Sequence, residues 1–393
     1  MLPPIRIAAS SEIWQRNQMS TLVARKSRQI CRPTKSIAIA CALSLMILAS
    51  PAAAEEMDHS QHDMTSHSAH TGAADHIHHS HGEGDWMLEY RFMRMSMGDL
   101  LDGTSKVDTR DISGVLPGTP PLPDPTKDYR MAPTDMTMDM HMLMFMYGIN
   151  ERISLMAMGS YLDNEMDMVM HMPMMDMFGT METDGLGDAL LGLMAKLDSR
   201  WTASLGVSLP FGDIDERVDM VMRGTNPMTG MPVTVTNANI KAGYPMQLGS
   251  GTYDLVPGIT YADAAEKLGW GFQASYRLRL GDNDNDYSLG DIAEVFGWAK
   301  YVMSPSLLVS GKLTYTDWGR IDGQDPELNP AMAPTTDPNA TGGKRLDVSL
   351  GLNGFFGNGH SLGLEVAVPA YQDLNRYQME TEWIVSLAYQ YMR

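Results

Sequence analysis

An alternation of apolar and polar side chains recurs in segment after segment from residue 86 to the last strand of the chain. Between 269 and 280, Trp270, Phe272 and Leu278 are separated by polar residues such as Gln273 and Arg277. Successive side chains of a β-strand point to opposite faces, so this pattern predicts strands with one apolar and one polar face. We predict twelve strands, centred on residues 86–97, 136–147, 152–162, 187–197, 201–210, 252–261, 269–280, 291–303, 306–316, 344–356, 361–369 and 381–391.

Long and short connections alternate between these strands. The long ones cover 98–135, 163–186, 211–251, 281–290, 317–343 and 370–380, and the short ones cover 148–151, 198–200, 262–268, 304–305 and 357–360. Outer-membrane barrels combine an even number of strands with short periplasmic turns and longer extracellular loops. A soluble β-sandwich gives no reason for this alternation. The sequence therefore predicts an all-β fold: an antiparallel transmembrane β-barrel of about 12 strands, in the outer membrane of a Gram-negative bacterium, with both termini periplasmic.

The last predicted strand carries a further sign of outer-membrane assembly. Trp383, Leu387 and Tyr391 share one face, as in the C-terminal signal that barrel-assembly machinery reads, although Met392 and Arg393 follow the final aromatic residue. Tryptophan and tyrosine also recur near the predicted strand ends, where such barrels have aromatic girdles. We expect outer-membrane lipid and the barrel-assembly machinery as partners.

The first 54 residues have the composition of an export signal. Five basic residues between 25 and 35 precede an apolar run from Ile37 to Leu48, and three alanines at 52–54 follow. This run of 12 residues is shorter than the roughly 20 that a transmembrane helix needs. We therefore predict a cleaved signal peptide over residues 1–54, with either Met1 or Met19 as the start of translation.

Removal of this signal leaves an acidic chain without cysteine. The signal contains both cysteines, Cys31 and Cys41, and seven basic residues against one acidic residue, so the net charge changes from −19 to −25. A chain of this charge repels nucleic acid, and we expect no nucleic-acid partner. The lack of thiols suits an oxidising compartment and excludes thiolate metal sites from the mature chain.

Histidine is concentrated just after the predicted cleavage site. Residues 55–85 have no apolar periodicity, and we predict a disordered His- and Met-rich periplasmic tail there, followed by the barrel at 86–393. Neutral imidazoles bind Cu(II), Zn(II) and Ni(II), whereas the alternative is a solvated spacer. We favour metal binding by the eight histidines His59, His62, His67, His70, His76, His78, His79 and His81.

Several segments are similar to a known family. They are S-L-P-F-G-D-I-D-E at 208–216, Y-P-M-Q-L-G-S-G-T-Y-D-L-V-P-G-I-T-Y at 244–261, L-G-D-N-D-N-D-Y-S-L-G at 280–290, Y-Q-D-L at 371–374 and M-D-M-H-M-L at 138–143. Together they resemble the outer-membrane β-barrel family named for the MetA pathway of phenol degradation, over residues 86–393. The resemblance implies a transporter-like outer-membrane protein and supplies no catalytic residues to carry over, and the family name suggests a hydrophobic or aromatic solute.

Methionine is the most unusual component, with 17 of the 36 methionines between Met131 and Met181. In the strand predicted at 136–147, six methionines at even positions share one face, opposite Asp139 and His141. If this face lined the lumen, its soft thioethers would offer a path for Cu(I) or Ag(I). We favour the alternative, a lipid-facing apolar face, because the opposite orientation aims Asp139 and His141 at lipid, where a charge costs on the order of 2 kcal/mol or more.

The predicted extracellular loop at 163–186 is also rich in methionine. Thioethers interleaved with an imidazole are suitable ligands for a soft metal ion. Methionine is also flexible and apolar, so the same residues can pack the loop over the barrel mouth, and the sequence does not choose between the two interpretations. The candidate metal ligands here are Met166, Met168, Met170, His171, Met172 and Met174.

One string matches a catalytic motif. The residues from Gly359 to Gly363 fit the G-x-S-x-G nucleophile elbow, which needs a helix after the serine and a histidine later in the chain. A period-two strand follows Ser361 instead, and no histidine follows His360. We interpret the string as a hairpin turn and predict that the chain is not an enzyme and requires no cofactor.

These observations predict an outer-membrane channel or transporter for a small solute. The family name points to a hydrophobic or aromatic compound, whereas the methionines and histidines point to copper as a bound ion or solute. The alternative is a copper-binding resistance protein for which the barrel serves as an anchor.

Overall fold

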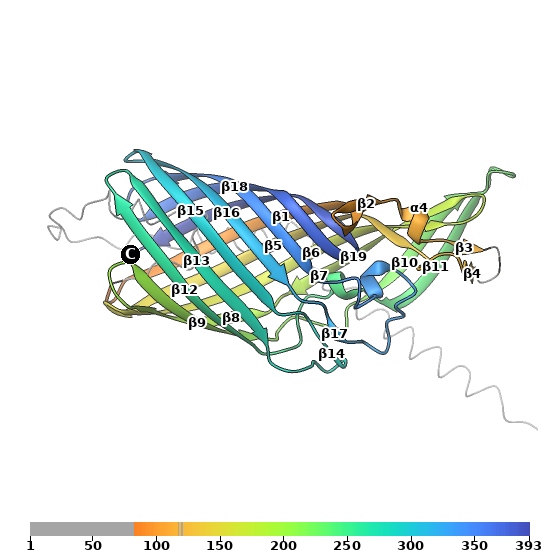
Figure 1. The fold of residues 1–393 in the computed structure, drawn as a ribbon, viewed down its shortest axis with the longest axis horizontal. Helices are drawn as coiled ribbons and strands as arrows, with labels where there is room; N and C mark the ends of the chain where they lie inside the picture. Colours follow the sequence, from red (N-terminus) through yellow and green to blue (C-terminus); the bar gives the residue numbers. More distant parts are fainter. Residues whose placement is uncertain (1–81, 117, 119–120) are drawn as a thin grey trace, which may run out of the picture. The chain divides into compact units, whose positions relative to one another are not determined.

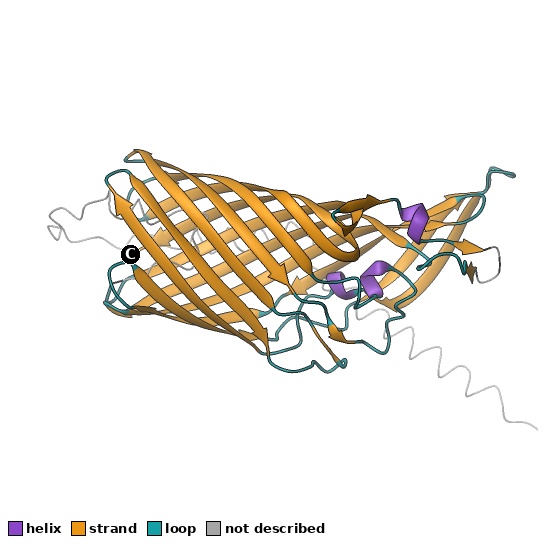
Figure 2. Ribbon diagram, in the orientation of Figure 1, coloured by secondary structure: helices purple, strands orange, loops and turns teal. Residues whose placement is uncertain are grey.

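The wall of the barrel is a ring of eleven antiparallel strands (Figures 1 and 2). The computed structural model describes residues 82–116, 118 and 121–393, so the predicted signal peptide and the eight tail histidines lie outside the described residues. The ring closes where β8 pairs with β6. Its strands, in order around the ring, are β6 (Ile153–His171), β5 (Ala132–Asn150), β1 (Trp86–Gly103), β19 (His360–Met392), β18 (Gly343–Phe355), β16 (Leu307–Trp318), β15 (Ile292–Ser304), β13 (Leu268–Arg279), β12 (Asp254–Ala265), β9 (Trp201–Leu209) and β8 (Ala189–Lys196).

β19 is itself a hairpin. Its first arm pairs with β18 from Ser361 to Leu374, and its second arm pairs with β1 from Leu374 to Met392. Gln372 accepts a hydrogen bond from the backbone N–H of Thr381 at 2.9 Å, which joins the two arms. Counted by arms, the wall has twelve strands, which confirms the predicted barrel of about 12 strands.

The turn that joins β18 to β19 contains the G-x-S-x-G string. Gly357, Asn358 and Gly359 have φ angles of 75°, 51° and 80°, a left-handed conformation that glycine and asparagine adopt most easily. Ser361 follows in β19, where its Oγ donates a hydrogen bond to Gln390 at 3.2 Å. The interpretation of this string as a hairpin turn is confirmed.

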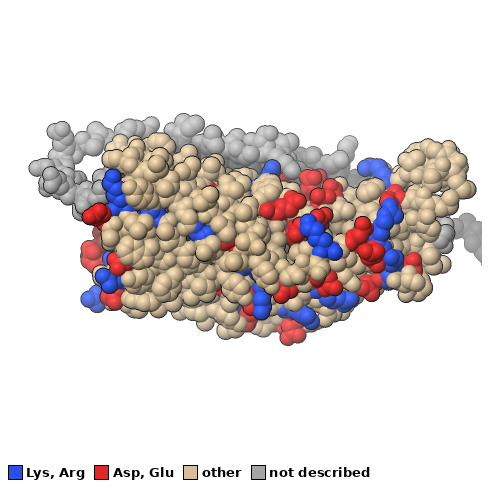
Figure 3. Space-filling view, turned by 45° about the horizontal axis from the view of Figure 1, so that its top comes forward, with Lys and Arg blue, Asp and Glu red and all other residues tan. Residues whose placement is uncertain are grey.

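The outward face of the wall is an apolar belt. Alternate residues of each strand expose large apolar side chains, and Leu350, the most exposed of those on β18, is 72% exposed. β8, β9, β12, β13, β15, β16 and β18 have 8 to 13 residues, close to the roughly 9–11 that cross a bilayer. Figure 3 shows this wall largely free of charge, with charged side chains gathered toward the ends. Strand length and surface chemistry together fit a membrane-spanning barrel.

The two ends of the barrel differ. At one end, the short-turn end, tight turns join the strands, and Trp201 and Tyr261 pack together with ring centroids 5.1 Å apart, as in an aromatic girdle. The other end, the long-loop end, carries the remaining elements. These are β2 (Ser105–Val107), α4 (Thr109–Ile112), β3 (Val115–Leu116), β4 (Leu122–Pro123), β7 (Asp176–Leu186), β10 (Arg217–Thr225), β11 (Pro232–Lys241), η1 (Tyr244–Met246), β14 (Tyr287–Ser288), β17 (Asp322–Gly323) and η2 (Pro334–Thr336). No helix in the described part of the chain is long and apolar enough to cross a membrane.

One side of the wall continues past the belt as an extension. β1, β5 and β6 have 18 or 19 residues, and β7, β10 and β11 add to the edge of β6 to form an open sheet, visible beyond the barrel in Figure 1. The prediction of a loop at 163–186 was therefore wrong. β6 continues to His171, only residues 172–175 form the connection, and β7 runs back to Leu186, because the period-two pattern of buried methionines continues through this segment. The connection predicted at 370–380 is likewise part of the β19 hairpin.

Candidate functional site

The methionine face of β5 points inward. Met136, Met144 and Met146 are at most 3% exposed, whereas Leu143 and Phe145 between them are 55% and 45% exposed on the outer face. Our preference for a lipid-facing methionine face was therefore wrong.

The polar residues that motivated that preference lie outward but have partners. Asp139 Oδ1 accepts a hydrogen bond from Arg94 Nε at 2.6 Å, and His141 Nδ1 lies 2.8 Å from the hydroxyl of Tyr90. Both lie in the part of β5 that precedes the apolar belt, where a paired charge does not meet the middle of a bilayer. A charge is costly at mid-membrane positions, but β5 has 19 residues and is longer than the membrane is thick.

Inward-facing methionines of neighbouring strands lie directly opposite one another in rows. At the long-loop end, the strand register pairs Met97 of β1 with Met136 of β5, Met136 with Met166 of β6, and Met166 with Met181 of β7. We call these four residues the long-loop row. Directly opposite residues have Cβ atoms about 4.5–5.5 Å apart, so neighbouring thioethers of the row are within reach of one another.

A second row lies at the other end of the same strands. Met392 of β19 pairs with Met87, Met87 with Met146, and Met146 with Met156. We call these four residues the short-turn row. Between the two rows, Met95 faces Met138 and Met93 faces Met140. A stripe of thioethers thus follows the inner face of β5 from one end of the barrel to the other, with methionines of β1 and β6 beside it at both ends.

In the extension, this stripe widens into a methionine core between the sheet and the loops. Ten buried and six half-buried methionines belong to one cluster. Its buried methionines are Met131, Met136, Met166, Met168, Met170, Met177, Met181, Met220, Met222 and Met246, and its half-buried ones are Met97, Met138, Met172, Met175, Met332 and Met379.

The six candidate ligands predicted at 166–174 are not all together. Met166, Met168 and Met170 are buried in the methionine core and Met172 packs against it, but Met174 is 60% exposed. The ring nitrogens of His171 lie 2.8 Å from Asp176 Oδ1 and 2.9 Å from Thr109 Oγ1. The structure therefore brings most of the thioethers together, whereas the imidazole of His171 is hydrogen-bonded to Asp176 and Thr109. Within the described residues, no group of three or more His, Cys, Asp or Glu side chains is arranged to hold a metal ion.

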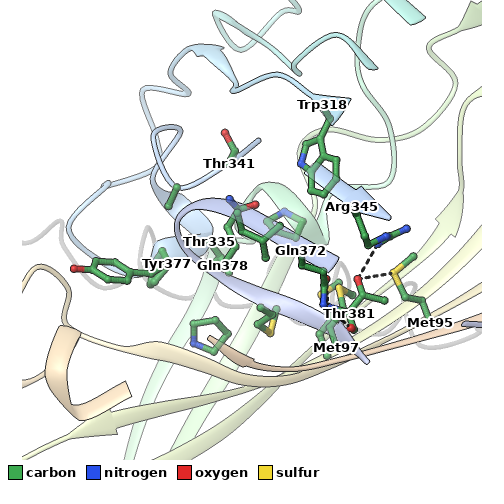
Figure 4. A pocket seen from close by; sticks show the side chains of 17 residues that line it. Met95, Met97, Trp318, Thr335, Thr341, Arg345, Gln372, Tyr377, Gln378 and Thr381 are labelled. Atoms are coloured by element: carbon green, nitrogen blue, oxygen red, sulfur yellow. Dashed lines mark hydrogen bonds between the residues drawn. The ribbon is translucent and has the colours of Figure 1, made fainter. Parts of the chain in front are cut away.

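A cavity of about 220 Å³ opens where the barrel meets the loops (Figure 4). It is bounded by inward side chains of β1, β5, β16, β18 and β19 and by residues around η1 and η2. Its lining residues are Met95, Met97, Pro133, Met136, Pro245, Trp318, Pro334, Thr335, Ala340, Thr341, Arg345, Gln372, Leu374, Tyr377, Gln378, Met379 and Thr381.

The polar groups of this lining bind one another. Arg345 donates from Nη1 to Thr381 Oγ1 at 2.8 Å and from Nε to Asp347 at 2.9 Å. Thr381 in turn donates to the thioether sulfur of Met95 at 3.9 Å, as Figure 4 shows. The side-chain amide of Gln378 donates to two backbone carbonyl oxygens, each at 2.7 Å. Since these groups are engaged within the wall, the cavity offers a solute mainly apolar contacts.

Buried polar contacts hold the loops over the cavity. Lys241, at the end of β11, has its Nζ 2.7 Å from Asp215 and 2.5 Å from Asp325, and its side chain is 3% exposed. A hydrogen bond from Lys241 lowers the pKa of Asp215, against the opposing effect of burial. Tyr129 donates to Asp337 Oδ2 at 2.8 Å, next to η2. Burial, together with this hydrogen bond, raises the pKa of Tyr129, so the hydroxyl keeps its proton and remains a donor.

Sequence reasoning did not find the cavity. Trp318, Pro245, Pro334 and Gln378 come from four separate connections or strand ends, and no spacing in the sequence links them. The signal that was present is the methionine periodicity of β1 and β5, which supplies Met95, Met97 and Met136 to the lining.

Comparison with known proteins shows the fold. No protein-family profile matches the chain, and no curated protein sequence matches it. Among solved structures, an outer-membrane channel from Pseudomonas putida F1 is similar with a TM-score of 0.50 and 13% identity, over 80% of this chain and 97% of that one. The P. putida toluene transporter TodX (TM-score 0.43, 10% identity, 79% and 90% covered) and the CymD monoaromatic hydrocarbon channel (0.40, 11%, 79% and 89%) are more distant. The chain thus has the fold of an outer-membrane β-barrel.

Proposed function

We propose that this protein is an outer-membrane channel that takes up a small apolar solute through the cavity at its long-loop end. The observation that carries the proposal is the cavity itself. It lies against the inner face of the barrel, its polar side chains are hydrogen-bonded to other protein groups, and its apolar side chains are left to contact a solute. The resemblance to a channel from Pseudomonas putida F1 supports the transport class, and the resemblance to the family named for phenol degradation supports an apolar or aromatic solute.

The volume of the cavity limits the size of the solute. An apolar cavity of about 150 Å³ in another protein binds benzene. A cavity of about 220 Å³ therefore accepts a compound with one aromatic ring and a small substituent, and a fused or extended solute would require the loops to move.

Uptake of benzene by intact cells tests this proposal, because an intact outer membrane slows the passage of apolar compounds that would cross a simple bilayer. Ala340 lines the cavity and is 4% exposed, so Ala340→Phe fills the cavity with a ring. We expect the protein-dependent uptake of radiolabelled benzene at low concentration to fall several-fold. Ala157→Phe, which adds the same ring on the outer face of β6, is the matched control and should leave uptake unchanged. Equal uptake by the parent protein and Ala340→Phe would refute the role of the cavity.

We further propose that the long-loop end faces the cell exterior, with both described chain ends in the periplasm. Protease added to intact cells should then cut the exposed tips at 172–175 and 226–231, where Met174, Met228 and Met231 are at least 60% exposed. The turn between β5 and β6 at 151–152 should be cut only after the outer membrane is opened. The reverse pattern would overturn this orientation.

The copper interpretations remain predictions. The tail histidines lie outside the described residues, and the alternative of a copper-resistance protein anchored by its barrel would be favoured if the benzene experiment failed while the deletion of 55–84 abolished Cu(II) binding.

A further inference from the structure

The long-loop row differs from an ordinary apolar core in its composition. A neighbouring cluster beneath the loop at 104–131 is built from Leu100, Ile112, Tyr129, Ala132 and Val169, without a buried methionine. Leucine and isoleucine pack with better-defined side-chain conformations than methionine, so packing alone does not call for ten buried methionines in one core. The same protein thus contains one core of aliphatic and aromatic residues and, beside it, one made mainly of methionine.

The geometry of the row suits a soft cation. Met97, Met136, Met166 and Met181 lie side by side on one face of four adjacent strands. Thioethers are soft, neutral ligands that select Cu(I) over harder ions. A monovalent ion also loses less hydration energy than a divalent one on entering an apolar site.

The row is reachable from the cavity. Met97 and Met136 line the cavity wall, and Met95 and Met379 add two further thioethers to the same wall. Arg345, the cationic residue of the cavity lining, is paired with Asp347 at 2.9 Å, which offsets its repulsion of an incoming ion. The short-turn row has no residue in the lining of this cavity.

From these observations we infer that the long-loop row binds a soft monovalent cation, Cu(I) or Ag(I), that enters through the cavity. Coordination by neighbouring thioether sulfurs of this row requires no proton loss and no change of oxidation state. The inference does not rest on the passage of an apolar solute, since benzene uptake is measured on cells and silver binding on purified protein, and either can fail alone.

The test is equilibrium dialysis of the purified full chain against Ag(I), which is stable in air. At pH 5 the imidazoles of the tail are protonated, since the unperturbed histidine pKa is about 6.5, whereas thioethers do not titrate. Thiols are alkylated beforehand in every sample, which removes Cys31 and Cys41 as ligands. X-ray absorption at the silver edge should then report a shell of sulfur neighbours.

The test variant replaces the whole long-loop row: Met97→Leu, Met136→Leu, Met166→Leu and Met181→Leu. Leucine keeps the volume and the apolar character, so the fold should persist. We expect the Kd for Ag(I) to rise by at least about 100-fold, the upper range seen when only the supporting residues of a metal site are lost. Because a fourfold change can impair folding, the single variant Met136→Leu, at the centre of the row, is measured beside it and should weaken binding in the same direction.

The matched control makes the same four changes in the short-turn row: Met87→Leu, Met146→Leu, Met156→Leu and Met392→Leu. It should bind Ag(I) as the parent protein does. The inference is overturned if the parent protein binds no Ag(I) at pH 5, if the long-loop variants bind it unchanged, or if only the control variant loses it.

Discussion

The membrane belt and the extension beyond it are built on the same strands but differ in the chemistry of their outer faces. In the belt, β5 and β6 present Leu143, Phe145 and Leu155 outward, and the inner face of the wall carries many polar side chains, such as Ser154 and Glu89. In the extension, outward positions carry acidic groups such as Asp139 and Asp163, and inward positions bury methionine. Between Asp135 and Gly148 of β5 the period of two continues from the extension into the belt. What changes is the solvent on the outer side, from lipid to water.

Outside the membrane, a charge is costly only where the protein itself excludes water. Lys241 and Asp325 show this case, with side chains 3% and 1% exposed. Lys106 bridges Asp99 and Glu380 on the surface of the extension. Its side chain is 64% exposed, so water solvates the charge and the charge costs little.

The largest effect should come from removing the buried cation. Lys241→Met leaves the Asp325 carboxylate buried without its partner, and loss of one member of a buried pair costs about 3–5 kcal/mol. We expect this loss in the local stability of residues 242–253 and 319–342, with the membrane-spanning wall intact. Hydrogen exchange of these segments measures it. Lys106→Met is the control and should change exchange nowhere, while unchanged exchange in Lys241→Met would show that the loops are held by other contacts.

A somewhat smaller effect should come from a charge placed in the belt. Leu350 faces outward near the middle of β18, and an arginine at the bilayer midplane of a barrel costs about 2–4 kcal/mol. We expect Leu350→Arg to lower the free energy of unfolding in lipid vesicles by this amount.

The same substitution in the extension is the matched control. Thr137 lies on the outer face of β5 opposite Glu165, so Thr137→Arg meets water and an acidic neighbour. The change should stay within about 0.5 kcal/mol, as for ordinary surface positions. Similar losses for both variants would mean that the membrane covers the extension, and the boundary drawn between the two regions would be wrong.

The alternation of apolar and polar residues was a clear signal of the barrel because it is a local property of the sequence. Each strand shows its period in ten or so residues, and loops that alternate in length need only be counted. The start of β5, the end of β6 and the whole of β7 were missed because methionine serves equally well on a lipid-facing surface, in a loop contact or in a core. With Leu143, Phe145 and Tyr147 on one face and Met142, Met144 and Met146 on the other, both faces of β5 read as apolar.

The amino-acid sequence by itself determined the strand period, the even number of strands, the alternation of turns and loops, and the residues that share a face. Only the tertiary structure decided which face of β5 is inside, because both faces of this strand are apolar. It also decided that four methionines from four strands stand in one row and that a cavity forms beside them. Register between strands is set by pairing over long sequence distances, and no local pattern contains it.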